Sequence, residues 1–251
     1  KNTSYPVGQK VVGFGGWQQY SVVDATQPGM LKKVDTTHVP LSHYLGAVGM
    51  PGVTAWYGLV KIIAPKAGDT VVITAASGAV GSAFGALAKA RGCRVVGIAG
   101  GAAKCDWVVK ELGFDACIDY KAGPGAVRAG LKEHAPQGVD IYFDNVGGDI
   151  LDQALARITR GARVIVCGAI SQYNNTTAVQ GPKNYLSLLV NRARMEGIVV
   201  FDYADRYHLA VAEMAGYLKD GRMKSKEDVV VGLQTFPETL LKLFNGENFG
   251  K

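Results

Sequence analysis

The sequence TVVITAASGAVGSAFG, residues 70–85, decides the fold. It opens with a β-branched run, passes at once into a glycine-rich turn, and continues with small and apolar residues at helical spacing as far as Arg91. This order predicts a strand over 70–76, a tight turn, and a helix over 81–91. Strand, turn and helix in immediate succession are typical of the first unit of a nucleotide-binding sheet.

Small residues stand at three places in that turn. Ala76, Gly78 and Gly81 match a variant of the dinucleotide fingerprint, in which one residue allows the turn, one lets backbone N–H groups approach a pyrophosphate, and one lets the helix pack closely on the strand. The start of the helix then faces the phosphates with unpaired N–H donors. The turn therefore predicts a dinucleotide site, and a buried turn without a ligand is the alternative.

Regular alternation of strands and helices surrounds this unit, from about residue 49 to residue 221. Six apolar strands separated by helices predict an α/β fold, a Rossmann-type doubly wound parallel sheet of six strands. The expected strands are 70–76, 94–99, 116–119, 139–144, 162–167 and 195–201, and the expected helices are 81–91, 103–112, 124–134, 148–157, 185–194 and 205–219. A long loop, 168–184, follows the fifth strand.

The two ends of the chain have a different character. Strands are expected over 10–14, 17–23 and 228–233, a helical stretch from Leu41, and a short helix opened by a capping box at 235–238. The simplest account is that residues 222–251 return to pack on residues 1–48. Because the chain begins at Lys1 within strand-like sequence, we expect that N-terminal sequence is missing.

Charge and cysteine usage bound the function. The net charge is +6 without a basic block or a basic–aromatic stripe, so no nucleic-acid partner is expected. No apolar run reaches the roughly 18 residues of a membrane span, so no membrane association is expected. Cys93, Cys105, Cys117 and Cys167 have no metal-ligand spacing and are predicted to be buried free thiols of a reducing compartment, the cytoplasm.

The second predicted strand indicates which nicotinamide cofactor binds. An NAD-preferring fold carries an acidic residue at the end of this strand, which bonds the ribose 2′-hydroxyl. Here the strand ends in Ile98-Ala99-Gly100, and no acid occurs before Asp106. Lys104 can instead reach a 2′-phosphate, which predicts NADP(H) rather than NAD(H). The alternative is a solvated lysine without any preference.

Five motifs carry a resemblance that covers essentially the whole chain. They are MPGVTA at 50–55, ASGAVG at 76–81, FDNVGG at 143–148, CGAISQYN at 167–174 and GENFGK at 246–251. Together they resemble the zinc-free medium-chain dehydrogenases/reductases, in particular the leukotriene B4 dehydrogenase, prostaglandin reductase and alkenal (curcumin) double-bond reductase group. The resemblance implies a partial GroES-like domain, 1–48 and 222–251, around an NADP-binding Rossmann domain, 49–221, and a homodimer.

The resemblance also implies the cofactor-binding residues. Tyr120 and Asn145 follow predicted strands at the edge where ligands bind, although a surface aromatic and a side-chain turn, respectively, are the alternatives. Backbone around Val199 would bond the carboxamide. The full implied set is Thr54, Ala76, Ser77, Gly78, Ala79, Val80, Gly81, Lys104, Tyr120, Asn145, Cys167, Gly168, Ala169, Ile170, Ser171, Tyr173, Ile198, Val199, Val200 and Asn248.

One departure from the family pattern concerns the substrate carbonyl. Eukaryotic relatives carry a tyrosine for it in the helix before the sixth strand, where this chain has Val190, with Tyr185 nearly two turns earlier. Tyr57 and Tyr173 are the remaining candidates for a catalytic hydroxyl. The group that bonds the carbonyl therefore stays open.

The expected reaction is reduction of the C=C bond of an α,β-unsaturated ketone or aldehyde, by hydride transfer from NADPH to the β-carbon. A zinc-free quinone reductase and a non-catalytic NADPH-binding redox sensor are the alternatives. A zinc site is not expected, because residues 1–48 hold no cysteine and His38 and His43 lie five apart. The apolar edge of the sixth strand, 198–201, is expected to pair with a second copy.

Overall fold

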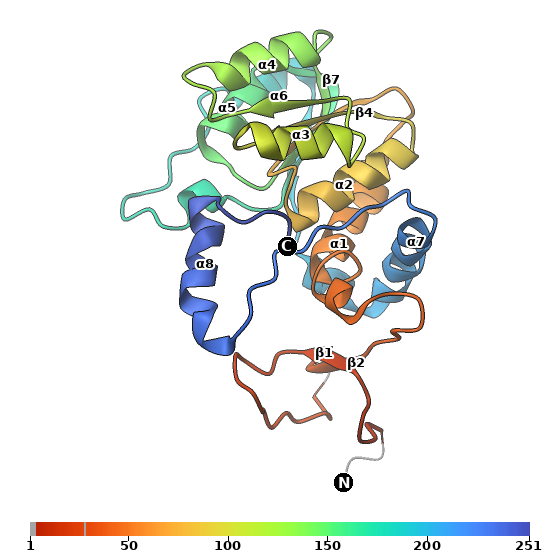
Figure 1. Ribbon diagram of the computed structural model, residues 1–251. Coiled ribbons are helices and arrows are strands. Elements are labelled where there is room, and N and C mark those ends of the chain that lie inside the picture. The colour runs from red at the N-terminus through yellow and green to blue at the C-terminus, as the bar shows by residue number, and fades with distance from the viewer. Residues whose placement is uncertain (1–3, 28) are drawn as a thin grey trace.

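The computed structural model describes residues 4–27 and 29–251, and a six-stranded parallel sheet forms its centre (Figure 1). The strands lie in the order β5-β4-β3-β6-β7-β8, so the direction of winding reverses between β3 and β6. This confirms the predicted Rossmann-type doubly wound sheet. The strands are β3 (Thr70–Thr74), β4 (Arg94–Ala99), β5 (Ala116–Asp119), β6 (Val139–Asp144), β7 (Ile158–Val166) and β8 (Arg194–Gly197).

Helices cover both faces of this sheet. On one face α1 (Met50–Trp56), α2 (Ala79–Ala90), α3 (Ala102–Lys110) and α7 (Tyr207–Lys219) share a core with alternate strand residues. On the other face α4 (Ala126–His134), α5 (Gly148–Leu155) and α6 (Leu186–Asn191) pack against the remaining strand residues. Because both faces are covered, successive residues such as Val71 and Val72 are both fully buried, which explains why these strands read as continuous apolar runs.

The two ends of the chain meet beside the sheet. β1 (Val11–Gly13) and β2 (Leu31–Lys33) form an antiparallel pair, and after α8 (Phe236–Asn245) the C-terminal segment runs to the centre of the molecule, beside α1 (Figure 1). His43 Nδ1 lies 3.1 Å from Glu227 Oε1, and a Cβ at Gly46 would touch the side chain of Lys251. The C-terminal segment therefore contacts the first region, as the sequence predicts.

Two predicted strands at these ends are wrong. Residues 17–23 and 228–233 form no strand, and their apolar side chains are exposed except for half-buried Val23, with Val22 and Val231 more than four-fifths accessible. Both segments have strand-forming composition. Neither has a neighbouring strand among the described residues with which to exchange backbone hydrogen bonds, and propensity alone does not form a ladder.

Three element boundaries also differ from the prediction. β8 ends at Gly197 rather than at 201, because its partner β7 ends at Val166, whose carbonyl accepts the last ladder bond from Ile198 N–H. The stretch from Leu41 is a short 3-10 turn, η1 (Leu41–Leu45). The sequence did not predict α1, which packs against α2, or the π-helical segment η2 (Tyr57–Ile63) that continues it.

The predicted capping box at the start of α8 is wrong. The hydroxyl of Thr235 donates to the carbonyl of Gly232 at 2.6 Å instead of accepting from the first helical turn. The preceding 3-10 turn, η5 (Leu233–Thr235), places the hydroxyl there. Pro237 in the first turn agrees with the prediction, since its missing N–H has no intrahelical acceptor in any case.

Close packing between α2 and the neighbouring layer depends on a glycine. Gly85 lies in the middle of α2, where a Cβ would overlap the ring of buried Phe114. Gly216, in the middle of α7, faces open space. Substitution of Gly85 therefore reports the effect of packing on stability, whereas substitution of Gly216 reports the effect of helix propensity alone.

We expect Gly85→Ala to lower the free energy of unfolding by about 2 kcal/mol or more, because the ring of Phe114 must move within a packed core. Gly216→Ala is the matched control and should raise that free energy by about 0.5–1 kcal/mol, because alanine restricts the unfolded chain without a clash. Urea unfolding followed by circular dichroism measures both. Equal effects of the two substitutions would contradict the packing argument.

Candidate cofactor site

The glycine-rich turn after β3 is built around an alanine. Ala75 has φ +50°, in the left-handed region, and its carbonyl accepts the N–H of Gly78 at 2.9 Å. A Cβ at Gly81 would overlap that same carbonyl, so only glycine allows α2 to begin this close to β3. The steric reason for Gly81 is thus as predicted, and the tight turn itself lies one residue earlier than Ala76.

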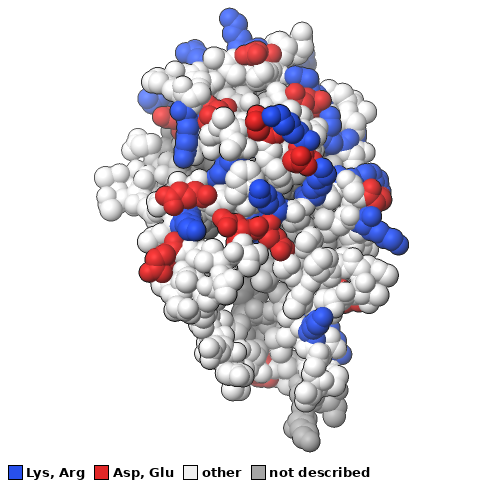
Figure 2. Space-filling model, in the orientation of Figure 1, with Lys and Arg blue, Asp and Glu red and all other residues white. Residues whose placement is uncertain are grey.

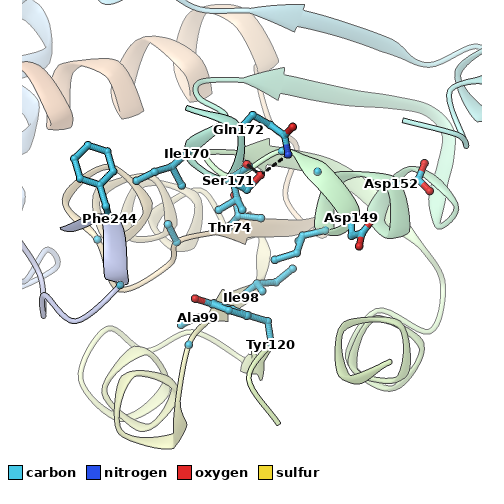
Figure 3. A pocket seen from close by; sticks show the side chains of 18 of the residues that line it. Thr74, Ile98, Ala99, Tyr120, Asp149, Asp152, Ile170, Ser171, Gln172 and Phe244 are labelled. Carbon is cyan, nitrogen blue, oxygen red and sulfur yellow. Dashed lines mark hydrogen bonds between the residues drawn. The ribbon is translucent and has the colours of Figure 1, made fainter. Parts of the chain in front are cut away.

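A cavity of about 870 Å³ opens beside this turn, at the carboxyl edge of the sheet (Figure 3). Its floor is the turn, with Ser77 and Gly78, and its walls come from the ends of three other strands and from the C-terminal segment. An edge where the winding reverses is where open α/β sheets bind their ligands. The size is that of a site for a cofactor or drug-sized molecule.

A buried polar cluster fixes the ends of β3 and β6 at this cavity. Asp144 is fully buried and accepts hydrogen bonds from the hydroxyls of Thr74 and Tyr142 and from the N–H groups of Val146 and Gly147. Burial raises the pKa of the Asp144 carboxyl, and the backbone donors of Gly147 and Val146 oppose that rise. Thr74 also accepts the N–H of Asn145 at 2.7 Å.

Lys104 and Tyr120, the two residues predicted for the adenosine side, both line the cavity. The Nζ of Lys104 donates to the carbonyl of Gly246 at 2.6 Å, so it joins α3 to the end of α8. Burial lowers the pKa of Lys104, and the charge of Lys121 adds to this. Tyr120 lies across Gly100, where any Cβ would come within 2.9 Å of its ring. The absence of a side chain at Gly100 thus leaves room for the phenol.

Part of the predicted cofactor set lines the cavity. Of the predicted residues, Ser77, Gly78, Lys104, Tyr120, Ile170, Ser171 and Asn248 do so. The others lie outside its lining: Thr54, Ala76, Ala79, Val80, Gly81, Asn145, Cys167, Gly168, Ala169, Tyr173, Ile198, Val199 and Val200. Most of the second group follows β7 and β8, on the side predicted for the nicotinamide.

Several polar groups of that second set, and the catalytic candidate Tyr57, already have hydrogen-bond partners within the protein. The amide of Asn145 donates to the carbonyl of Thr74 at 2.8 Å, and the hydroxyl of Thr54 donates to the carbonyl of Met50 at 2.8 Å. Tyr57 is buried, and its hydroxyl donates to the carbonyl of Arg206 at 2.8 Å. Tyr173 is 61% exposed, and its hydroxyl accepts the N–H of Ala169 at 3.2 Å.

Sequence reasoning missed two walls of the cavity. One comprises residues 146–150 with Asp152, and the other comprises residues 243–246 at the end of α8. The pair Gly147-Gly148 directly after β6 could have indicated the first wall, because positive φ at both glycines turns the chain there. Loop residues 180–183 complete the lining, and Asn184 ties them to Asp152 through three hydrogen bonds.

The sequence also predicts that the cysteines are buried free thiols and that the histidines bind no metal. All four cysteines are free, but only Cys93 is fully buried, while Cys105, Cys117 and Cys167 are half-buried. Within residues 4–27 and 29–251, no group of three or more His, Cys, Asp or Glu side chains could hold a metal ion. His38 and His43 lie on a smaller cavity beside Trp107 instead.

The surface charge is mixed. Figure 2 shows basic and acidic side chains interspersed over the part of this face that holds the large sheet, with few charges on the part formed by the N-terminal residues. Across the described part of the chain, no helix is both long and apolar enough to span a membrane.

Comparison with known proteins gives a consistent set of similarities. Residues 79–216 match the model of the family described as zinc-binding dehydrogenase. The chain is 43% identical to the NADP-dependent 2-alkenal reductase of Nicotiana tabacum over 97% of its length and 70% of the relative's. It is 40% identical to the NADPH-dependent curcumin reductase of Escherichia coli (strain K12), over 98% of its length and 72% of the relative's.

The same similarity holds in three dimensions. The crystal structure of CurA from Vibrio vulnificus in complex with NADPH superposes with a TM-score of 0.89 at 41% identity. The superposition covers 98% of this chain and 73% of that one. The fold thus has a counterpart that was crystallised with NADPH.

Proposed function

Because this chain belongs to the zinc-binding dehydrogenase family, we propose that it reduces the C=C bond of α,β-unsaturated ketones and aldehydes with NADPH. Within the family it belongs to the zinc-free medium-chain dehydrogenases/reductases, which include the alkenal, curcumin and prostaglandin reductases. The observation that carries the proposal is the cavity at the reversal point of the sheet, with Lys104 in its wall. NADP-dependent relatives at 40–43% identity support the same reaction.

We propose that the cofactor lies across the carboxyl edge of the sheet, with its diphosphate over Ser77 and Gly78. The first N–H groups of α2 have no intrahelical acceptor and suit an anion there. Lys104 would bond the 2′-phosphate, Tyr120 would contact the adenosine, and Asn248 would close the site from the C-terminal segment. The residues after β7 and β8, outside the cavity lining, would hold the nicotinamide half.

The bound nicotinamide supplies the hydride, and the protein must orient the substrate and stabilise the enolate oxygen that develops. A tyrosine hydroxyl can donate a hydrogen bond to that oxygen. Tyr173 meets this need better than Tyr57, because it is exposed and its hydroxyl proton is free while its oxygen accepts from Ala169. The hydroxyl proton of Tyr57 is already donated to Arg206 inside the core.

The domain division follows from the same proposal. Residues 49–221 form the cofactor domain, and residues 1–48 with 222–251 form part of a GroES-like substrate domain. The contacts of the C-terminal segment with His43 and Gly46 support this division. We place the protein in the cytoplasm, since its four cysteines are free thiols.

We also propose a homodimer formed along the free edge of β8. β8 is the last strand of the sheet, and all four of its residues are exposed. The predicted apolar edge needs correction, because only Val199 and Phe201 of residues 198–201 are exposed, at 56% and 58%, while Ile198 and Val200 are buried. An exposed edge strand flanked by apolar side chains suits pairing with a second copy.

NADPH oxidation in the presence of enals, enones and quinones tests the reaction. We expect turnover with enals and enones, and we expect Tyr173→Phe to lower kcat/KM by about 10-fold to 1000-fold, the usual cost of losing one oxyanion donor. Tyr57→Phe is the control and should act mainly on stability. Turnover restricted to quinones would favour the quinone reductase, and cofactor binding without any turnover would favour the sensor.

Replacement of Lys104 tests the phosphate contact. We expect Lys104→Ala to raise the KM for NADPH by about tenfold, equivalent to roughly 1.4 kcal/mol, and to leave the KM for NADH unchanged, because only NADPH carries the 2′-phosphate. Lys110→Ala, on the same helix and paired with Asp106 at the surface, is the matched control. An equal change for both cofactors would contradict the assignment.

Light scattering tests the dimer. We expect twice the mass of one chain at micromolar concentration, and we expect Phe201→Glu to yield monomers because it places a charge at the β8 edge. Val109→Glu changes a residue of α3, whose strand neighbour β5 is the opposite edge of the sheet, and should leave the dimer intact. A monomeric wild-type protein would refute this interface.

A further inference from the structure

Two of the four cysteines lie in contact beside the cofactor cavity. Cys105, in the first turn of α3, and Cys117, in β5, have their sulfur atoms 2.9 Å apart, with the Cys117 thiol donating to Cys105 Sγ. A disulfide bond is about 2.05 Å long, so the sulfur atoms need approach by only about 0.9 Å. Both side chains are half-buried and therefore reachable by a small reagent.

The two thiols are not equivalent. Burial raises the pKa of both, but the hydrogen bond donated by Cys117 lowers that of Cys105, while the same bond raises that of Cys117. Cys105 is therefore the sulfur on which a thiolate forms first, with Cys117 in place beside it. Two thiols in contact, of which one forms the sulfenic acid and the other resolves it, are the arrangement of cysteines that respond to oxidants.

The segments that carry these cysteines also form the wall for the 2′-phosphate. Lys104 directly precedes Cys105, and its Nζ reaches the carbonyl of Gly246 across the cavity edge. Two residues after Cys117, Asp119 accepts the N–H of Gly101, which stands just before α3. Tyr120 N–H then bonds the carbonyl of Ala99, another lining residue. Movement of either sulfur therefore acts on the wall of the cavity.

We propose that Cys105 and Cys117 are a site of reversible oxidation, which forms a disulfide with hydroperoxides and thereby weakens NADPH binding. The Cys105 thiolate attacks the peroxide oxygen and becomes a sulfenic acid, with release of water or the corresponding alcohol. The Cys117 thiol then displaces water from that sulfenic acid as the S–S bond forms. Two thiols and one hydroperoxide thus give one disulfide, one water and one further molecule of water or alcohol. A dithiol then reduces the disulfide to the two thiols by exchange and is itself oxidised to a disulfide.

The effect on cofactor binding follows from the position of Lys104, and this part rests on the proposed function. Closing the sulfur–sulfur distance draws the first turn of α3 toward β5. The turn carries Lys104, whose contact with a phosphate oxygen depends on distance at the scale of this movement. The disulfide therefore selectively weakens the contact that distinguishes NADPH from NADH.

Peptide mass spectrometry tests the modification without any measurement of activity. After limited hydrogen peroxide treatment we expect a Cys105–Cys117 cross-link in the wild-type protein, its loss on dithiothreitol treatment, and its absence in Cys105→Ser and Cys117→Ser. Cys93→Ser and Cys167→Ser are the matched controls and should keep the cross-link. No cross-link, a pairing that involves Cys93 or Cys167, or only irreversible over-oxidation would overturn the proposal.

Direct binding of NADPH and NADH, without an enone, tests the coupling. We expect oxidation to raise the Kd for NADPH by about threefold or more and to leave that for NADH unchanged, with recovery on reduction and no change in Cys117→Ser. A disulfide that forms but leaves both affinities unchanged would overturn the coupling and leave the proposed reductase intact. If no enone is reduced, the proposed function fails while the mass and binding results still stand.

Discussion

The structure depends most on the buried contact between Thr74 and Asp144, at the point where the sheet reverses its winding. The carboxylate receives hydrogen bonds from two strands and from the turn after β6, so it sets where β3 and β6 end. Burial raises its pKa, and its ionisation above that pKa weakens the folded state, a cost that the surrounding donors offset in part. The cavity exists because these two strands end together and their following turns diverge.

The sequence predicts the central sheet well and the chain ends poorly, for one physical reason. Strands buried on both faces need apolar residues at nearly every position, and the amino-acid order of residues 70–76 and 139–144 carries that pattern by itself. Residues 17–23 and 228–233 have a strand-forming composition too but form no strand, because a ladder requires a partner that composition cannot supply. β8 is short for a related reason, since its partner ends at Val166.

Some residues of the candidate site can be predicted from the neighbouring sequence, whereas others depend on contacts between distant parts of the chain. The turn with Ser77 and Gly78, and Lys104 after β4, were predictable because strand–turn–helix order and charge are local features. The wall formed by residues 243–246 was not, because it depends on where α8 lies relative to a strand some 140 residues earlier. Tyr57 shows the converse, since a tyrosine chosen from the sequence for its hydroxyl donates that hydroxyl to the carbonyl of Arg206 inside the core.

The bond between Lys104 and the carbonyl of Gly246 makes the C-terminal segment part of the wall of the proposed cofactor site. An ammonium has three N–H donors, so Lys104 can keep this bond while it donates to a phosphate oxygen. A ligand that holds Lys104 in place therefore also holds residues 243–248 in place. Because such coupling is reciprocal, an ordered segment 243–248 raises the affinity of the protein for that ligand. In the proposed binding mode, the turn at 75–81 holds the diphosphate of a dinucleotide, whereas the choice between dinucleotides depends on two segments that meet only in the folded chain.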